Sequence, residues 1–115
     1  MAKQPDHSFE YNGKNYPCCT SLTMGVIGGK WKTVILYHLS AGKMRYNELR
    51  KAMPMVTERT LSLQLQQLQD DGIITRTVYA DKPPLKVDYE LTKVGLTLIP
   101  LVHAIAKWGH ERANG

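Results

Sequence analysis

The chain has 115 residues, of which 43% are hydrophobic, and its 15 Lys and Arg residues against 10 Asp and Glu residues give a formal net charge of +5. This length predicts one domain with one core. No apolar run approaches the roughly 20 residues needed to cross a bilayer, so the sequence excludes a membrane-embedded protein, and we expect a cytoplasmic one without membrane partners.

The beginning of the chain differs in character from the rest. Residues 1–17 are polar and lack the apolar stretch of a signal peptide, so we expect a polar N-terminal extension there. Residues 18–115 are expected to form a single folded domain.

The first helices of this domain are predicted from their apolar spacing. Residues 20–27 and 30–40 indicate two helices that a pair of glycines separates. The second of them has an inward face made of Trp31, Ile35 and Leu39. Met44 and Arg45 then predict a short strand.

A third helix is predicted over residues 46–53. Leu49 and Met53 lie four apart in it, which is the spacing of one buried helical face. Pro54 ends this helix because it has no amide proton and disfavours helical geometry in the residue before it.

A fourth helix is predicted between Thr57, a suitable N-cap, and the stop at Gly72. Its buried face consists of leucines at i, i+4 and i+7, namely Leu61, Leu65 and Leu68. The remaining faces are rich in hydroxyl and amide groups, which suit reading of bases in the major groove. This is the candidate recognition helix, and its base or groove contacts are predicted to be Thr57, Glu58, Arg59, Thr60, Ser62, Leu63 and Gln66. The alternative is an ordinary solvated helix face.

Two strands follow, over residues 74–79 and 86–91, because both segments are rich in β-branched and aromatic residues and the second alternates at period two. The loop at 80–85 is too long for a tight two-residue turn and contains two prolines, which limit its freedom. We interpret this hairpin as a wing that holds Lys82 and Lys86 toward the sugar-phosphate backbone, although either could be a routine surface lysine.

The basic residues concentrate around the proposed reading element. Seven of them fall between positions 30 and 59, where only Glu48 and Glu58 oppose them. Such a surplus is the electrostatic signature of a phosphate-binding face, but it can also serve solubility. The predicted phosphate contacts are Lys30, Lys32, Lys43, Arg45, Lys82 and Lys86.

The end of the chain predicts a long helix over about 93–110, capped by Thr92 and bent or divided at Pro100. It carries more apolar surface than so small a domain can cover by itself, although ordinary core packing could absorb much of it. We expect two such helices to pair and form a homodimer whose recognition helices lie about 34 Å apart, one turn of DNA. The predicted dimer contacts are Met24, Leu98, Leu101, Val102, Ile105 and Trp108.

The order of these elements predicts a fold of the α+β class, mostly α: a winged helix-turn-helix with a two-stranded wing and a long C-terminal dimerisation helix. The four histidines and two cysteines have no zinc-binding spacing, and no paired carboxylates or nucleophile with base are recognisable. We therefore expect no metal, no cofactor and no enzymatic activity.

Several motifs together resemble one known family. They are Val26-Ile27-Gly28-Gly29-Lys30-Trp31, Arg45-Tyr46-Asn47-Glu48-Leu49, Leu65-Gln66-Gln67-Leu68 with Asp71-Gly72, and Tyr89-Glu90-Leu91-Thr92. In this order they are similar to the HxlR-type winged helix-turn-helix transcription regulators of bacteria, over about residues 18–109. The resemblance implies a homodimeric, cytosolic regulator that binds double-stranded DNA, often near genes for detoxification or for electrophile and redox stress.

The resemblance also directs attention to Cys18, because many members look similar in having a cysteine just before the first helix. A thiol at a helix N-terminus has its thiolate favoured by the helix dipole, so Cys18 is a possible redox sensor. The alternative is an inert buried cysteine. This chain departs from the family pattern at Cys19, where a Pro is common, and at Leu63, where a polar residue is more typical.

Two functions are compatible with these observations. The first is a sequence-specific, homodimeric transcriptional regulator that responds to a redox, electrophile or small-molecule signal. The second is a winged-helix protein-interaction module without sequence-specific DNA binding, which an exposed Leu63 and an apolar C-terminal helix would favour.

Overall fold

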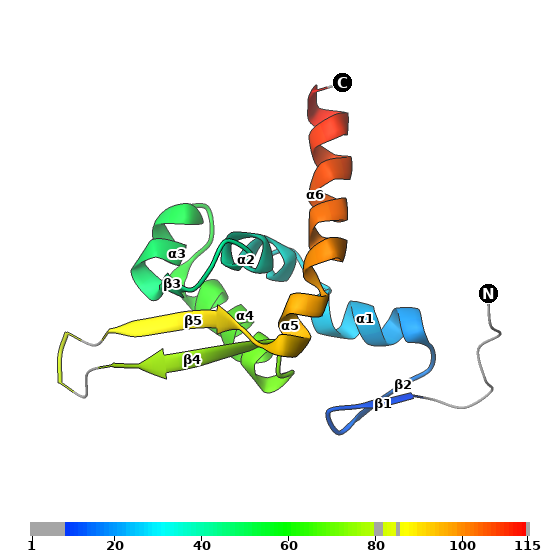
Figure 1. The fold of residues 1–115 in the computed structure, drawn as a ribbon, viewed down its shortest axis with the longest axis horizontal. Helices are drawn as coiled ribbons and strands as arrows, with labels where there is room; N and C mark the ends of the chain where they lie inside the picture. The colour runs from blue at the N-terminus through cyan, green and yellow to red at the C-terminus, as the bar shows by residue number, and fades with distance from the viewer. Residues whose placement is uncertain (1–8, 80–81, 85, 115) are drawn as a thin grey trace.

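The computed structural model describes residues 9–79, 82–84 and 86–114. Helices and a small sheet surround one hydrophobic core, while a helix at the C-terminus projects away from it (Figure 1). The elements in chain order are β1 (Phe9–Tyr11), β2 (Lys14–Tyr16), α1 (Cys19–Ile27), α2 (Lys32–Leu39), β3 (Met44–Arg45), α3 (Tyr46–Ala52), α4 (Glu58–Asp70), β4 (Ile74–Val78), β5 (Val87–Leu91), α5 (Lys93–Thr97) and α6 (Ile99–Asn114).

The winged helix-turn-helix fold is confirmed. Helices α3 and α4 form the helix-turn-helix, and the antiparallel pair β4 and β5 forms the wing that extends beyond them (Figure 1). The short strand β3 joins the other edge of β5, so the wing belongs to a three-stranded sheet in the order β3-β5-β4. The central strand β5 therefore connects the wing to the segment that leads directly into α3.

The core is built from the apolar spacing found in the sequence. In α4 the predicted leucines are fully enclosed, and Leu49 and Met53 contribute the matching face of α3. Helix α2 lies against α4 and supplies Ile35 and Leu36. Because these side chains share one cluster, the two helices of the helix-turn-helix are fixed by burial of apolar surface rather than by their short connection.

The predicted ends of α4 are also confirmed. The hydroxyl of Thr57 accepts a hydrogen bond from the backbone N–H of Thr60 at 3.1 Å, which satisfies one of the unpaired amides of the first turn. At the other end, Gly72 has a φ of +74°, a conformation that favours glycine, and it turns the chain into β4.

The predicted C-terminal helix is divided in two. Thr92 caps α5, where its hydroxyl accepts from the N–H of Gly95 at 3.0 Å, and α6 then begins after Leu98. Pro100 is the second residue of α6, in the first turn, where a missing amide proton costs no helical hydrogen bond. Helix α6 packs on α2 near its start, and its C-terminal part extends away from the body of the molecule (Figure 1).

Part of the expected N-terminal extension is folded. Strands β1 and β2 form a hairpin with a two-residue turn at Asn12 and Gly13, whose φ values of +52° and +81° are those of a type I′ turn. The hairpin packs under α1, where a Cβ on Gly25 would lie 2.5 Å from the ring of Tyr16. The folded unit therefore begins before Cys18, while residues 1–8 of the expected extension lie outside the described residues.

We expect Gly95→Ala to destabilise the fold. A Cβ at Gly95 would lie 2.1 Å from the backbone oxygen of Ile73, so α5 and the start of β4 would have to separate. Overpacking of this kind costs about 1–3 kcal/mol, and urea unfolding followed by circular dichroism measures it. The matched control is Gly109→Ala on α6, where the same Cβ meets open space and helix propensity favours alanine. Equal unfolding midpoints for the two variants would contradict this account.

Candidate nucleic-acid interface

Helix α4 presents a polar face to solvent on the side opposite its buried leucines. Six of the seven predicted contact residues are exposed, whereas Thr60 is half-buried. The Thr60 hydroxyl accepts a hydrogen bond from the Thr57 hydroxyl at 3.0 Å, so this pair also organises the first turn. Leu63 is 53% exposed and interrupts the polar face with an aliphatic group.

The exposed side chains of α4 differ in how freely they can meet a ligand. The amide of Gln66 donates to the carboxylate of Asp70 at 2.9 Å, which restrains it along the helix. Among the described residues, the side chains of Arg59 and Ser62 have no hydrogen bond or ion pair. These two residues are therefore the groups of the face most available for a new partner.

A cleft of about 760 Å³ separates α4 from the wing. Ser62 contributes from α4, and Lys86 contributes from the wing. The cleft also contains Asn47 from the first turn of α3 and Arg76 from β4, neither of which the sequence analysis had selected. Alternation along β4 places Arg76 on the opposite face from Thr75 and Thr77, on the same face as its cross-strand partner Tyr89, which also lines the cleft.

An ion pair joins β3 to the wing, near the end of β5 that follows the loop. The guanidinium of Arg45 lies 2.7 Å from the carboxylate of Asp88, whose side chain is only 8% exposed, and the two residues are paired across β3 and β5. The ring of Tyr79 lies 5.6 Å from the Arg45 guanidinium and 5.9 Å from the ammonium of Lys43. Arg45 thus has a structural partner as well as an exposed edge on the cleft.

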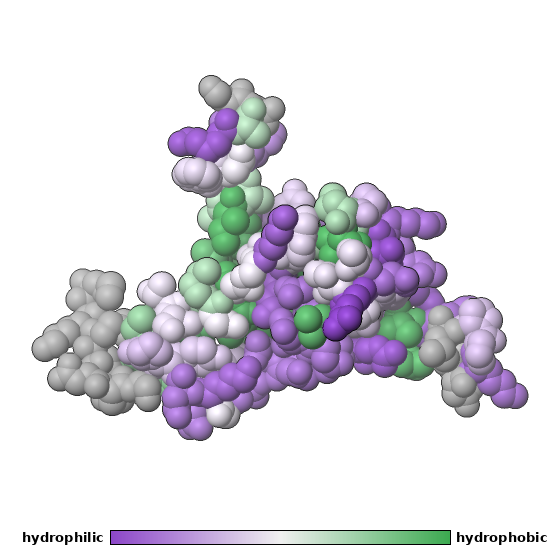
Figure 2. Space-filling model, turned by 180° about the vertical axis from the view of Figure 1, so that it is seen from behind, coloured by the Kyte–Doolittle hydropathy of each residue, from purple (hydrophilic) through white to green (hydrophobic). Residues whose placement is uncertain are grey.

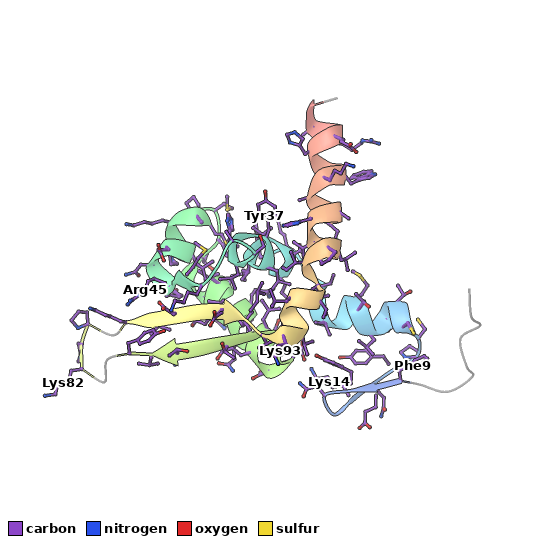
Figure 3. All side chains as sticks on the ribbon, viewed as in Figure 1. Phe9, Lys14, Tyr37, Arg45, Lys82 and Lys93 are labelled. Carbon is purple, nitrogen blue, oxygen red and sulfur yellow. The ribbon has the colours of Figure 1, made fainter. Side chains whose placement is uncertain are left out.

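The predicted phosphate contacts differ in their exposure to solvent. Lys30, Lys43, Lys82 and Lys86 are exposed, and Figure 3 shows Lys82 at the tip of the wing and Arg45 on the neighbouring strand β3. The prediction is wrong for Lys32, which is only 7% exposed. It precedes Leu36 and Leu39 by four and seven residues, so helical geometry turns it toward the same buried face of α2.

The predicted dimer contacts lie on α1, on α6 and at Leu98, which separates α5 from α6. Met24, Leu101, Ile105 and Trp108 are exposed, Trp108 to 63%, and Leu98 is half-buried. Figure 2 shows a band of hydrophobic surface along the projecting helix. The prediction is wrong for Val102, which is 1% exposed and packs within the core of the subunit. It lies about 100° around the helix from Leu101 and faces inward.

Cys18 occupies the N-cap position of α1. Its sulfur accepts a hydrogen bond from the backbone N–H of Ser21 at 3.4 Å, and the residue is half-buried. Cys19 is exposed, and the two cysteines are not joined in a disulfide. The predicted position of Cys18 at a helix N-terminus is therefore observed, next to the turn that leads from β2 into α1.

Across residues 9–79, 82–84 and 86–114, no three His, Cys, Asp or Glu side chains gather in a way that could hold a metal ion. No helix in this described part of the chain is both long enough and apolar enough to span a membrane.

Known proteins are similar to this chain both in amino-acid sequence and in fold. Residues 26–115 match the sequence model of a family described as HxlR-like helix-turn-helix. The chain belongs to this family. An uncharacterised HTH-type transcriptional regulator of Bacillus subtilis, YybR, is 49% identical over 97 residues, which cover 84% of this chain and 77% of YybR.

Solved structures of similar proteins have the same fold. The redox regulator HypR in its oxidised form is 47% identical, with a TM-score of 0.76 over 82% of this chain and 96% of HypR. The HTH-type transcriptional regulator ytcD is 43% identical, with a TM-score of 0.77 over 84% of this chain and 98% of ytcD. The chain is accordingly a transcriptional regulator of the HxlR type. The proteins that it matches here are transcriptional regulators and not enzymes.

Proposed function

We propose that this HxlR-type regulator is a homodimer that binds double-stranded DNA sequence-specifically and regulates nearby genes. The observation that carries the proposal is the exposed polar face of α4 beside a cleft with basic residues on its walls. In a helix-turn-helix the second helix enters the major groove, and residues near its N-terminal end reach the base edges.

The chemistry of α4 suits this role. Arg59 can donate two hydrogen bonds to guanine, and Leu63 can contact the methyl group of thymine. Thr57, Thr60 and Ser62 offer hydroxyls, while Glu58 can accept from cytosine. Gln66 is a weaker candidate, because a base contact would break its hydrogen bond to Asp70. Phosphate contacts are proposed for the exposed cations Lys30, Lys43, Arg45, Lys82 and Lys86.

A two-fold dimer would present two such helices to successive major grooves. The exposed apolar stripe of α6, with Leu101, Ile105 and Trp108, is proposed as its centre, flanked by Met24 and Leu98. The stripe lies on a helix whose C-terminal part extends beyond the subunit, so a second copy can cover it without disturbing the core (Figure 1).

An oxidant or electrophile is proposed as the signal, with Cys18 as the responding thiol. Cys18 is half-buried rather than enclosed, and modification of its sulfur would remove the N-cap of α1. The similar protein HypR is described as a redox regulator and has been solved in oxidised and reduced forms. A small-molecule effector is the alternative signal.

A second candidate function is a protein-interaction module. It is favoured by the exposure of Leu63 and of Met55 in the turn before α4, because both are apolar groups on the proposed DNA-binding side. Absence of duplex binding at low salt, together with retention by a protein partner, would favour this candidate over DNA binding.

Replacement of Arg59 and of Lys82 by alanine separates base reading from phosphate binding. Arg59→Ala is expected to weaken binding to the specific duplex by about 1–3 kcal/mol and to weaken binding to random duplexes far less. Lys82→Ala is expected to weaken both alike and to reduce the slope of log K against log salt by about one unit. Fluorescence anisotropy titrations at several salt concentrations measure both effects. Equal losses on specific and random duplexes for Arg59→Ala would count against base reading.

The dimer is tested at the centre of the apolar stripe. Ile105→Glu places a charge where the partner subunit would cover it, so association is expected to weaken about 100-fold or more. Size-exclusion chromatography with light scattering would then report a monomer. Lys107→Glu is the matched control, since Lys107 is exposed on the opposite side of α6. An unchanged mass for Ile105→Glu would move the interface elsewhere.

The thiol signal is tested with diamide or a quinone. Treatment is expected to abolish the mobility shift of the protein's own upstream DNA for wild type and for Cys19→Ser. Cys18→Ser is expected to keep the shift, because serine still caps the helix but offers no thiol. Equal loss of the shift in treated Cys18→Ser would rule out Cys18 as the sensor.

A further inference from the structure

Three consecutive backbone carbonyls, from the last residue of α4 into the turn that follows it, accept hydrogen bonds from side chains outside that helix. The pairs are Asp70 with the amide of Asn12, Asp71 with the hydroxyl of Tyr11 at 2.9 Å, and Gly72 with the hydroxyl of Thr92 at 2.7 Å. The last carbonyls of a helix have no partner within the helix itself. These donors therefore complete the C-terminal end of α4.

Two of the three donors come from the N-terminal hairpin, about 60 residues away along the chain. The type I′ turn fixes the backbone of Asn12, and Tyr11 is partly buried against the core. The hairpin thus restricts the side chains of Tyr11 and Asn12 independently of their hydrogen bonds to the end of α4. The hairpin also packs under α1, whose N-cap is Cys18, so it connects that cap with the end of α4.

The same end of α4 is the joint between the helix and the wing. Gly72 turns the chain there, and β4 starts at Ile74. A helix of 13 residues is about 20 Å long, so a tilt of about 10° at this joint moves the opposite end by about 3 Å. That displacement equals the length of a hydrogen bond and is enough to break contacts with base edges.

We infer that the hairpin is a clamp that sets the orientation of α4 for DNA reading, with Tyr11 and Asn12 as its positioning residues. The inference rests on the proposed function, because it concerns how α4 is presented to a duplex. Neither residue touches DNA in this arrangement. Their hydrogen bonds hold the C-terminal end of α4, while the residues proposed to read bases lie toward its N-terminal end.

The double variant Tyr11→Phe/Asn12→Gly tests the clamp. It removes both donors but keeps the aromatic ring and a residue that tolerates the positive φ of the turn. Tyr16→Phe is the matched control, since the Tyr16 hydroxyl has no hydrogen-bond partner among the described residues of the chain. The probes are a duplex that the wild-type protein enriches from a randomised pool and a random-sequence duplex. Titrations are made well below the melting temperature, with folding verified by circular dichroism.

The double variant is expected to bind the enriched duplex about three- to tenfold more weakly, with random-duplex binding unchanged within about twofold. Amide hydrogen exchange is expected to accelerate in the last turn of α4 but not in α3. Tyr16→Phe should behave as wild type in both measurements. A merely structural role would lower binding to both duplexes together and leave their ratio unchanged.

An unchanged ratio of the two affinities, or unchanged exchange in the last turn of α4, would overturn the clamp. If the wild-type protein enriches no duplex, the proposed sequence-specific DNA binding is wrong, independently of the clamp. The exchange measurement then still decides whether the hairpin holds α4, because it requires no DNA.

Discussion

The burial of three leucines on one side of α4 is the constraint on which the rest of the structure depends. Leu61, Leu65 and Leu68 are almost completely enclosed, and burial of each leucine side chain stabilises the fold by about 1.5–3 kcal/mol. Rotation of α4 about its axis would expose all three at once. The rotation of the helix about its own axis is therefore fixed, and Arg59 and Ser62 face solvent because the leucines cannot.

A second constraint operates where β3 joins the wing. Asp88 lies in the central strand of the sheet, and its ion pair with Arg45 ties that strand to the residue just before α3. The same pair offsets part of the positive charge of Arg45. The cleft between α4 and the wing consequently depends more on Arg76 and Lys86 for its positive potential than the count of basic residues in the sequence suggests.

Elements with a strong local signal could be predicted from the sequence. The leucine spacing in α4, the caps at Thr57 and Thr92, and the break near Pro100 are all determined by residues close together in the chain. Side chains that depend on which face of a helix meets its neighbour were harder to place. Lys32 and Val102 are buried because α2 and α6 pack as they do, and spacing alone leaves that choice open.

The N-terminal hairpin was not predicted from the sequence, although part of its signal was present there. Asn12-Gly13 between aromatic residues is a strong hairpin signal, so β1 and β2 were within reach of sequence reasoning. The contact of that hairpin with Asp71 was not, because no local pattern encodes a hydrogen bond between residues so distant in the chain. Likewise, Asn47 and Arg76 line the same cleft only because of how α3 and β4 are placed relative to each other in the fold.

The projecting part of α6 has a thermodynamic consequence. A few helical turns that project from the body of the molecule are only marginally ordered in water by themselves, since helix propagation adds little free energy per residue. Ordering of these turns is thereby coupled to whatever covers Trp108 and its neighbours. For an associating protein this coupling makes the melting temperature rise with protein concentration, so the stability of the regulator would vary with its abundance in the cell.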